Sequence, residues 1–589
     1  MSKIQFRVLY REFLFRVVDL ELLAPQGDTN KLLGQFAGLL IFCSLWLSAI
    51  ATIAAGPGRG NRLLDMLYHW MAQHFLIATT MLAVGLFAVM SWESMFPDRR
   101  DVLILSPLPV RARTTLFAKA AAVATALSIT VSALNGFTGL VLPWGFASQG
   151  ATHVMRAFGA WWATQFAAGL FMFCSVLTVQ GMAQLLRRQA YLRVSSWLQT
   201  ALFILILTVY FLQPPFSEVQ DLLANESALR WIPSYWFFGL FHQLSGSILA
   251  PPAFLAARAW MGLGAALCGA IAAYLIANFR TLPMLAEQPD ILPARRGLGR
   301  LPRFGDSLQT AVVQFSVCTL LRSRHHRVVL TFYLGLGLGL AIFISHMPEV
   351  YLRASGFGEW YRQNAPLLMA STLILCAAVL GTRVVFSLPL EVRANWIFRM
   401  MPQAGVRRCL AASRRSLYVL AVAPVWMSSA ALFFYLWPWR VAAEHLILLG
   451  ALASAVAELS IHGFHKIPFT CSYLPGKTRF NMALVYLWLF LLVTEWAADR
   501  EIAALSRPDL YVCTLCILVT LALLARWRSG AAAQSEGEQV QFEETPEPAV
   551  LALDLHRDGV TTIRSPGESE RCSRISSGRG GWAQPPAGR

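Results

Sequence analysis

Three ionisable side chains, Glu458, His462 and His465, are spaced four and three residues apart. On a helix this spacing places them on one face. A carboxylate with two imidazoles is a ligand set that zinc accepts, but the spacing alone is unspecific. A hydrogen-bonded polar patch at a helix end is the favoured interpretation, so we predict no metal and no cofactor in this chain. Arg383 lies alone in an apolar run and is the expected partner of Glu458.

A second candidate for chemistry is Gly476-Lys477-Thr478, which looks like the end of a phosphate-binding loop. The full pattern needs a glycine five residues before Gly476, and that position is Cys471. It also needs a preceding strand. We therefore predict no ATPase in this chain, no catalytic residue and no covalent chemistry.

Two charged segments share a pattern that suits a protein surface better than a reaction. Each has an acidic residue, a basic residue two positions later and a proline about ten residues on. Charged flanks around a short, proline-ended helix would give a stiff lever with a salt-bridge surface. Ordinary loop charges that cap helix ends are the alternative. The residues are Asp98, Arg100, Pro109, Arg111 and Lys119 in the first segment, and Glu391, Arg393 and Pro402 in the second.

The elements that position these residues are membrane helices. Apolar residues make up 56% of the 589 residues and charged residues only 14%, too few to cover a soluble surface of this size. Runs of membrane-spanning length recur along the chain. We predict an all-α polytopic membrane protein with twelve spans, at 33–55, 75–92, 118–142, 161–185, 196–212, 260–279, 328–346, 366–387, 416–437, 443–463, 481–497 and 509–525.

The distribution of Lys and Arg sets the expected orientation. With the N-terminus in the cytoplasm, most of the 49 basic residues fall in inside segments, as the positive-inside rule requires. The same bias explains the net charge of +17 without a nucleic-acid partner. We expect a multi-pass protein of the cell (inner) membrane with both termini cytoplasmic.

The two six-span halves form a weak repeat. A shift of 293 residues superposes the first three spans on spans seven to nine and aligns Asp98 with Glu391, Arg100 with Arg393 and Pro109 with Pro402. Such repeats usually form pseudo-symmetric bundles around a shared pathway. The expected parts are a first half over 1–279, a cytoplasmic linker with a second interfacial segment over 280–327, a second half over 328–527 and a disordered cytoplasmic tail over 528–589.

Two short segments are expected to lie at the membrane surface or only partly within it. Residues 4–20 alternate arginines with large apolar residues, which is typical of an interfacial helix. Residues Trp231 to Phe241 are aromatic, too short to span and on the predicted outer side.

The layout and the stretch from Asp98 through Leu108-Pro109-Val110 to Lys119 resemble the membrane subunits of type-2 ABC exporters. The second copy, with Met401-Pro402-Gln403, is more divergent. The resemblance implies an elbow helix before each half, cytosolic loops that dock on a separate ATP-binding cassette subunit, and ATP bound on that partner. Membrane lipid and a further permease copy are also possible partners, and the expected substrate is amphipathic or lipid-like.

Two other classes stay open. Asp98-Arg99-Arg100 also resembles the loop motif of the major facilitator family, an ion-gradient-driven transporter of 6+6 layout, although the glycines of that motif are missing. Such a transporter needs buried acids in its pathway, and Glu458 is nearly the only candidate. A membrane-embedded enzyme would need a convergent set of His, Asp or Glu at one membrane depth.

Overall fold

The computed structural model describes residues 3–18, 62–96, 110–144, 150–186, 188–213, 229–247, 252–277, 302–345, 359–390, 406–462 and 500–535, with short pieces near 40–49, at 108 and within 464–470. Within these ranges every regular element is a helix. The predicted all-α class is therefore confirmed.

Among the described residues, ten helices are long and apolar enough to cross a membrane. They correspond to ten of the twelve predicted spans. The other two, 33–55 and 481–497, lie largely outside the described residues, although Leu40–Ala49 contains a short apolar helix. A multi-pass membrane protein is thus supported.

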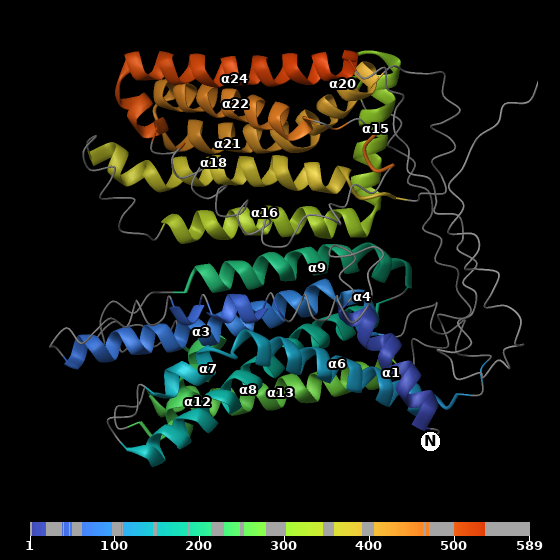
Figure 1. Ribbon diagram of the computed structural model, residues 1–589, viewed down its shortest axis with the longest axis vertical. Helices are drawn as coiled ribbons and strands as arrows, with labels where there is room; N and C mark the ends of the chain where they lie inside the picture. Colours follow the sequence, from blue (N-terminus) through green and yellow to red (C-terminus); the bar gives the residue numbers. More distant parts are fainter. Residues whose placement is uncertain are drawn as a thin grey trace, which may run out of the picture.

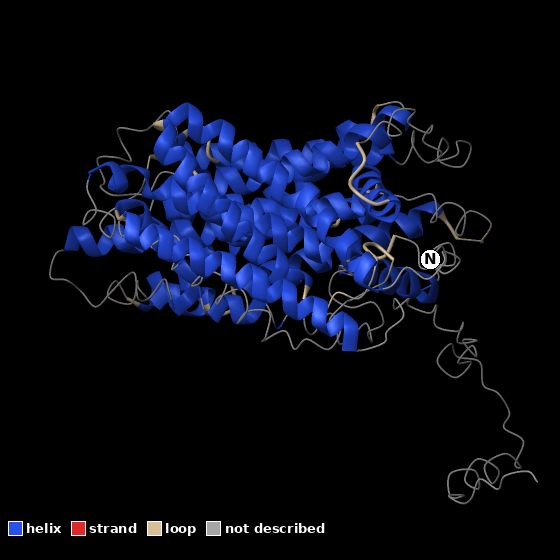
Figure 2. Cartoon of the chain, turned by 90° about the horizontal axis from the view of Figure 1, so that it is seen from above, coloured by secondary structure: helices blue, strands red, loops and turns tan. Residues whose placement is uncertain are grey.

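The long helices run along a common direction (Figures 1 and 2) and form two stacks, while α15 runs across that direction (Figure 1). The stacks meet where α9 packs against α16. One stack contains α1 (Lys3–Val18), α3 (Arg62–Met90), α4 (Trp92–Met95), α6 (Ala112–Leu134), α7 (Thr138–Val141), α8 (Ala151–Gln184), α9 (Arg188–Phe211), α12 (Pro233–Ser245) and α13 (Ala253–Ile276). The other contains α15 (Ser307–Arg322), α16 (Arg324–Ser345), α18 (Glu359–Phe386), α20 (Val406–Leu417), α21 (Ala423–Leu436), α22 (Trp439–Ile461) and α24 (Pro508–Ser535).

Two helices, α1 and α15, lie at the same end of the molecule, which we call the α15 end (Figure 1). There α1 packs on α6 and α15 packs on α20. The expected amphipathic character of α1 is only partly present. Phe13 and Leu14 are buried while Arg7 and Arg11 are exposed, but the apolar residues Ile4 and Val8 are exposed as well. A capping box of Asp306 with Gln309 begins α15.

Two helices differ from the predicted boundaries. The helix at the ninth predicted span begins at Val406, ten residues before the predicted start. It does so because α20 continues through a π-helical turn at Tyr418–Val422 into α21. Pro424 follows that turn, and proline removes a helical N–H donor that the wider turn accommodates. The tail predicted from 528 is wrong at its start, since α24 ends at Ser535. Only 6% of the apolar stretch of α24 is buried in the protein.

Glycines bring α16 close to both neighbours, as the Leu-Gly repeat of 334–340 predicts. A Cβ atom at Gly335 would fall within 3 Å of Leu207 and Phe203 on α9. A Cβ atom at Gly337 would overlap that of Ala377 on α18. Small residues allow this close approach in membranes, where dispersion contacts replace the hydrophobic drive between helices. Gly335 thus allows close contact between the two stacks, and Gly337 allows close contact within the second stack.

We expect Gly337→Leu to destabilise the protein by about 1–3 kcal/mol, the usual cost of overpacking. The measurement is the thermal unfolding midpoint in detergent. Gly264→Leu on α13 is the control, because a Cβ there meets nothing within 4 Å. Equal midpoints for the two variants would contradict the close α16–α18 contact.

Candidate functional site

The predicted docking residues fall mostly outside the described residues. This applies to Asp98, Arg100, Pro109, Glu391, Arg393 and Pro402. Arg111 is exposed directly before α6. Lys119 is buried, so it supports this region from inside and does not face a partner.

The described residues that lead into the first segment, 91–96, are fixed by polar side chains from three helices. The Lys119 ammonium donates to the Phe96 carbonyl at 2.7 Å and lies over the Phe13 ring of α1. Gln180 of α8 donates to the Trp92 carbonyl, and the Trp92 indole donates to the Ser195 hydroxyl at 3.0 Å. Carbonyls that a helix end leaves unpaired are thus satisfied without water.

The residues that lead into the second segment, 386–390, are fixed in a similar way. His326, buried at the start of α16, donates from Nε2 to the Leu388 carbonyl at 3.0 Å. A carbonyl only accepts, so Nδ1 accepts from the Ser323 hydroxyl at 2.6 Å. The Leu390 amide donates to Phe469, whose own amide donates to Phe386.

A short polar path joins these two regions. Gln199 of α9 donates to the Val89 carbonyl at 2.7 Å, and its own carbonyl oxygen accepts two bonds from Arg324, each 3.0 Å. Arg324 lies two residues before His326, which holds Leu388. The two segment bases are therefore connected by hydrogen bonds through α9 and α16.

The predicted pairing of Glu458 with Arg383 is wrong. Glu458 is buried and forms an ion pair with Arg414 of α20 at 2.8 Å. Arg383 donates to the Ser460 carbonyl and the Ser387 hydroxyl, and its guanidinium lies over the Phe464 ring. The two residues are thus held by different partners, although both lie near the α15 end.

The predicted polar patch at the end of α22 is only partly described. His462 is exposed beyond the helix, and His465 lies outside the described residues. Arg414 also donates to Ser529 of α24 at 3.2 Å. The Glu458 carboxylate thus anchors α20 to α22, and Arg414 extends the contact to α24.

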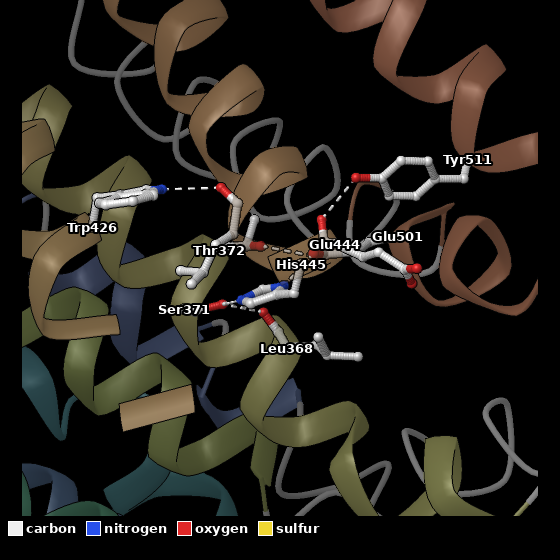
Figure 3. A network of polar contacts seen from close by, with 9 residues as sticks. Leu368, Ser371, Thr372, Trp426, Glu444, His445, Glu501 and Tyr511 are labelled. Atoms are coloured by element: carbon white, nitrogen blue, oxygen red, sulfur yellow. Dashed lines mark hydrogen bonds and ion pairs between the residues drawn. The ribbon is translucent and has the colours of Figure 1, made fainter. Parts of the chain in front are cut away.

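A second buried ionisable cluster lies between α18, α22 and the helical residues 500–506 (Figure 3). His445 Nδ1 lies 2.5 Å from Glu501 Oε1, and His445 Nε2 lies 3.2 Å from the Ser371 hydroxyl. Thr372 donates to the other oxygen of Glu501 at 3.4 Å. His445 is fully buried.

The hydrogen bonds of this cluster are arranged around His445. The Ser371 hydroxyl donates to the Leu368 carbonyl at 2.8 Å, which leaves its oxygen able to accept from His445 Nε2. On the other side of the ring, Nδ1 faces the Glu501 carboxyl group. The cluster thus connects α18, α22 and residues 500–506 through buried polar contacts.

Sequence reasoning missed this pair. Glu501 lies in a stretch read as a connecting segment, and His445 sits in an apolar span 56 positions away. A buried acid was expected at Glu458 alone. A histidine inside an apolar run was the available signal, because such a group needs a partner.

The aromatic segment Trp231 to Phe241 forms α12, which is too short to span and packs on α3, α8 and α13. It ends in a glycine, Gly246, at φ 69°. Its His242 is enclosed by the rings of Trp70, Phe238 and Phe241 at centroid distances of 4.6–5.3 Å. Burial lowers the pKa of His242 to about 4.

Replacing His445 by Gln should cost about 3–5 kcal/mol, because the Glu501 carboxylate then lacks its counter-ion in a buried site. The thermal unfolding midpoint in lipid nanodiscs measures this. Glu444→Gln, an exposed neighbour on α22, is the control. A midpoint for His445→Gln as high as that of the control would show that His445 and Glu501 do not form a stabilising ion pair.

His242 should make the fold sensitive to acid. Its folded pKa lies below the unfolded value of about 6.5, so the unfolded chain binds more protons between pH 6.5 and 4 and stability falls as the pH is lowered through that window. In His242→Phe the unfolding midpoint should decrease less between pH 7 and 4.5 than in the native protein. Parallel decreases would show that His242 does not contribute.

Comparison with known protein families, with curated proteins and with solved structures finds no match to this chain. The functional argument therefore rests on geometry. Its main elements are two fixed segment bases at one end, a polar path between them, and a buried ion pair in each of two places within the second stack.

Proposed function

We propose that this chain is the permease subunit of an ABC-type exporter, driven by a separate ATP-binding subunit that docks at the α15 end. One observation carries the proposal. The bases of both charged segments lie at the same end and are joined by the path Val89–Gln199–Arg324. A partner that moves one segment would move the other.

The proposed architecture is twelve spans in two repeated halves. A shift of 293 residues aligns α3 with α18. The same shift aligns α6 with α20 and α21. In each half an amphipathic helix packs on the element after the charged segment, α1 on α6 and α15 on α20. These pairings support the repeat that the sequence predicts.

Charge supports a cytoplasmic α15 end. Exposed arginines gather on the elements there, whereas positive charge at the opposite end is sparser, as the positive-inside rule favours. An acidic docking surface on the ATPase would complement this basic face. The exposed residues are Arg7, Arg11, Arg111, Arg113, Arg322, Arg407, Arg408 and Arg415.

Fixed segment bases suit such a motor. Force applied to a loop is transmitted only if the loop base does not yield, and buried hydrogen bonds in a low-dielectric setting are costly to break. Lys119 and His326 hold the two bases through buried backbone carbonyls. ATP-driven closure of the partner would then change the packing of the two stacks, and an amphipathic or lipid-like substrate would move between them.

A secondary transporter driven by an ion gradient is the second candidate. The buried His445–Glu501 pair favours it, because a membrane-embedded carboxylate with an ionisable partner is the usual element of proton relays. The pair alone does not distinguish the two candidates, because they differ in the energy source that drives transport. Export that persists without a proton gradient but requires ATP selects the first.

Reversing the charge of Arg111, Arg113, Arg407 and Arg408 should release the ATPase, since four cations on the basic face would become repulsive to an acidic partner. The readout is ATPase activity that co-purifies with the permease from native membranes at low salt. We expect at least a tenfold loss in the fourfold Glu variant.

The matched control reverses Arg440 and Arg507, which are exposed at the other end. Their variant should retain the ATPase. Equal loss in both variants, or an ATPase that never co-purifies with the native chain, would contradict the docking proposal. Thermal midpoints of all three proteins establish that each is folded.

A further inference from the structure

Two arginines meet where α24 packs on α20 and α22 at the α15 end (Figure 1). Arg414 of α20 donates to the Ser529 hydroxyl of α24 at 3.2 Å, and that hydroxyl donates to the Arg526 carbonyl, one turn earlier, at 2.9 Å. Arg414 is also paired with Glu458 of α22 at 2.8 Å. We call these four residues, Arg414, Glu458, Arg526 and Ser529, the α24 cluster.

The α24 cluster carries more positive than negative charge. Its acid, Glu458, is buried, and the charges of Arg414 and Arg526 both act on it. The other described acids of α20, α22 and α24 are Glu444 and Asp509, which lie at the opposite end. The Arg526 side chain is exposed and forms no hydrogen bond or ion pair with the described residues. One of the two cations is therefore left to attract an anion from outside the protein.

The surface beside Arg526 is apolar and faces away from the protein. Leu523 and Val519 lie one and two turns before Arg526 on the same face of α24, and both are exposed. Trp527 is exposed at the same level, as tryptophans are at the boundary between hydrocarbon and headgroups. Among the ten candidate spans of the described residues, α24 has the smallest buried share. A cation thus lies at the end of an apolar stripe that faces acyl chains.

Helix α20 adds a further exposed arginine. Arg407 precedes Arg414 by seven residues, so the two share one face of α20 at a separation of about 10 Å along the helix. Arg408 and Arg415 share the neighbouring face, and Arg415 donates to the Phe304 carbonyl before α15. Arg407 forms no hydrogen bond or ion pair within the described residues. It extends the positive charge of the α24 cluster away from the membrane span.

We propose that the α24 cluster binds the headgroup of an anionic phospholipid in the leaflet at the α15 end. Arg526 pairs with the phosphate, Arg407 adds attraction to the headgroup, and an acyl chain lies along Leu523 and Val519. Basic sites between membrane helices suit anionic headgroups, and guanidinium groups bind phosphate oxygens through paired hydrogen bonds. A soluble acidic partner would use the arginines but not the apolar stripe. Lipid is the occupant that fits both.

A lipid in this place would strengthen the contact between α20 and α24. Among the described residues, the direct polar contact between these helices is the bond from Arg414 to Ser529. A phosphate near both helices would add a second connection, next to the helix that follows the second charged segment. This binding requires no ATPase, so its test is independent of the proposed function.

The experiment uses the full chain, purified in a non-ionic detergent and depleted of native lipid. Phosphatidylglycerol and phosphatidylcholine with identical acyl chains are titrated separately, and native mass spectrometry counts the lipids bound at each concentration. We expect the first phosphatidylglycerol molecule to bind at least tenfold more tightly than the first phosphatidylcholine molecule. It should also raise the thermal unfolding midpoint.

Arg526→Gln should weaken phosphatidylglycerol binding about fivefold, the usual effect of one basic residue near a membrane surface. Phosphatidylcholine binding should not change. Arg526→Lys keeps the charge and should keep most of the affinity, whereas Arg407→Gln combined with Arg526→Gln should abolish the preference. Arg528→Gln is the matched control, because Arg528 is also exposed but lies on the other side of the buried positions Ala525 and Ser529.

Equal affinity of the native chain for the two lipids would overturn the proposal and would leave the arginines to an acidic protein partner. Equal losses in Arg526→Gln and Arg528→Gln would also contradict it, since the general positive charge of this end would then attract the lipid. Arg414 is not replaced, because its loss would leave Glu458 buried without a partner. Unfolding midpoints in phosphatidylcholine establish that each variant is folded.

Discussion

A helix that ends within a lipid-facing bundle leaves carbonyl groups that water does not reach, and each must find a donor inside the protein. This requirement organises the α15 end. Phe96 takes its donor from Lys119, and Leu388 takes its donor from His326. Lys119 lies 23 residues from the carbonyl it satisfies, and His326 lies 62 residues from its carbonyl. The need to pair backbone groups therefore also fixes which helices are neighbours, and it makes the two segment bases firm.

Hydropathy predicts much of the architecture, because span length is set by bilayer thickness and needs no knowledge of neighbours. Ten spans, the short aromatic α12 and the close packing of α16 follow from local pattern alone. The partner of each buried charge does not follow from local pattern. Glu458 was recognised as a buried acid, but its counter-ion is Arg414, which the sequence places at a cytoplasmic helix start. In the predicted topology Arg383 lies as near to Glu458 as Arg414 does. Only the packing of α20 against α22 decides which arginine pairs with Glu458.

The pair of His445 and Glu501 shows the same limit more sharply. Neither residue belongs to a motif, and their separation along the chain carries no periodic signal. Only the folded arrangement brings Ser371, Thr372 and the two ionisable groups together. The two stacks also differ in their interiors: the second contains the buried ion pairs Arg414–Glu458 and His445–Glu501, whereas in the first several neutral polar atoms lie beside aromatic rings without a partner.

Helix α24 packs along α22 but otherwise presents its side chains to the surroundings. Its polar ties are few: the Tyr511 hydroxyl donates to the Glu444 carbonyl near one end, and Ser529 accepts from Arg414 near the other. Acyl chains demand only that a residue be oily, not that it have a given shape. The middle of this helix should therefore tolerate exchange of one apolar residue for another better than the positions of Tyr511 and Ser529 do.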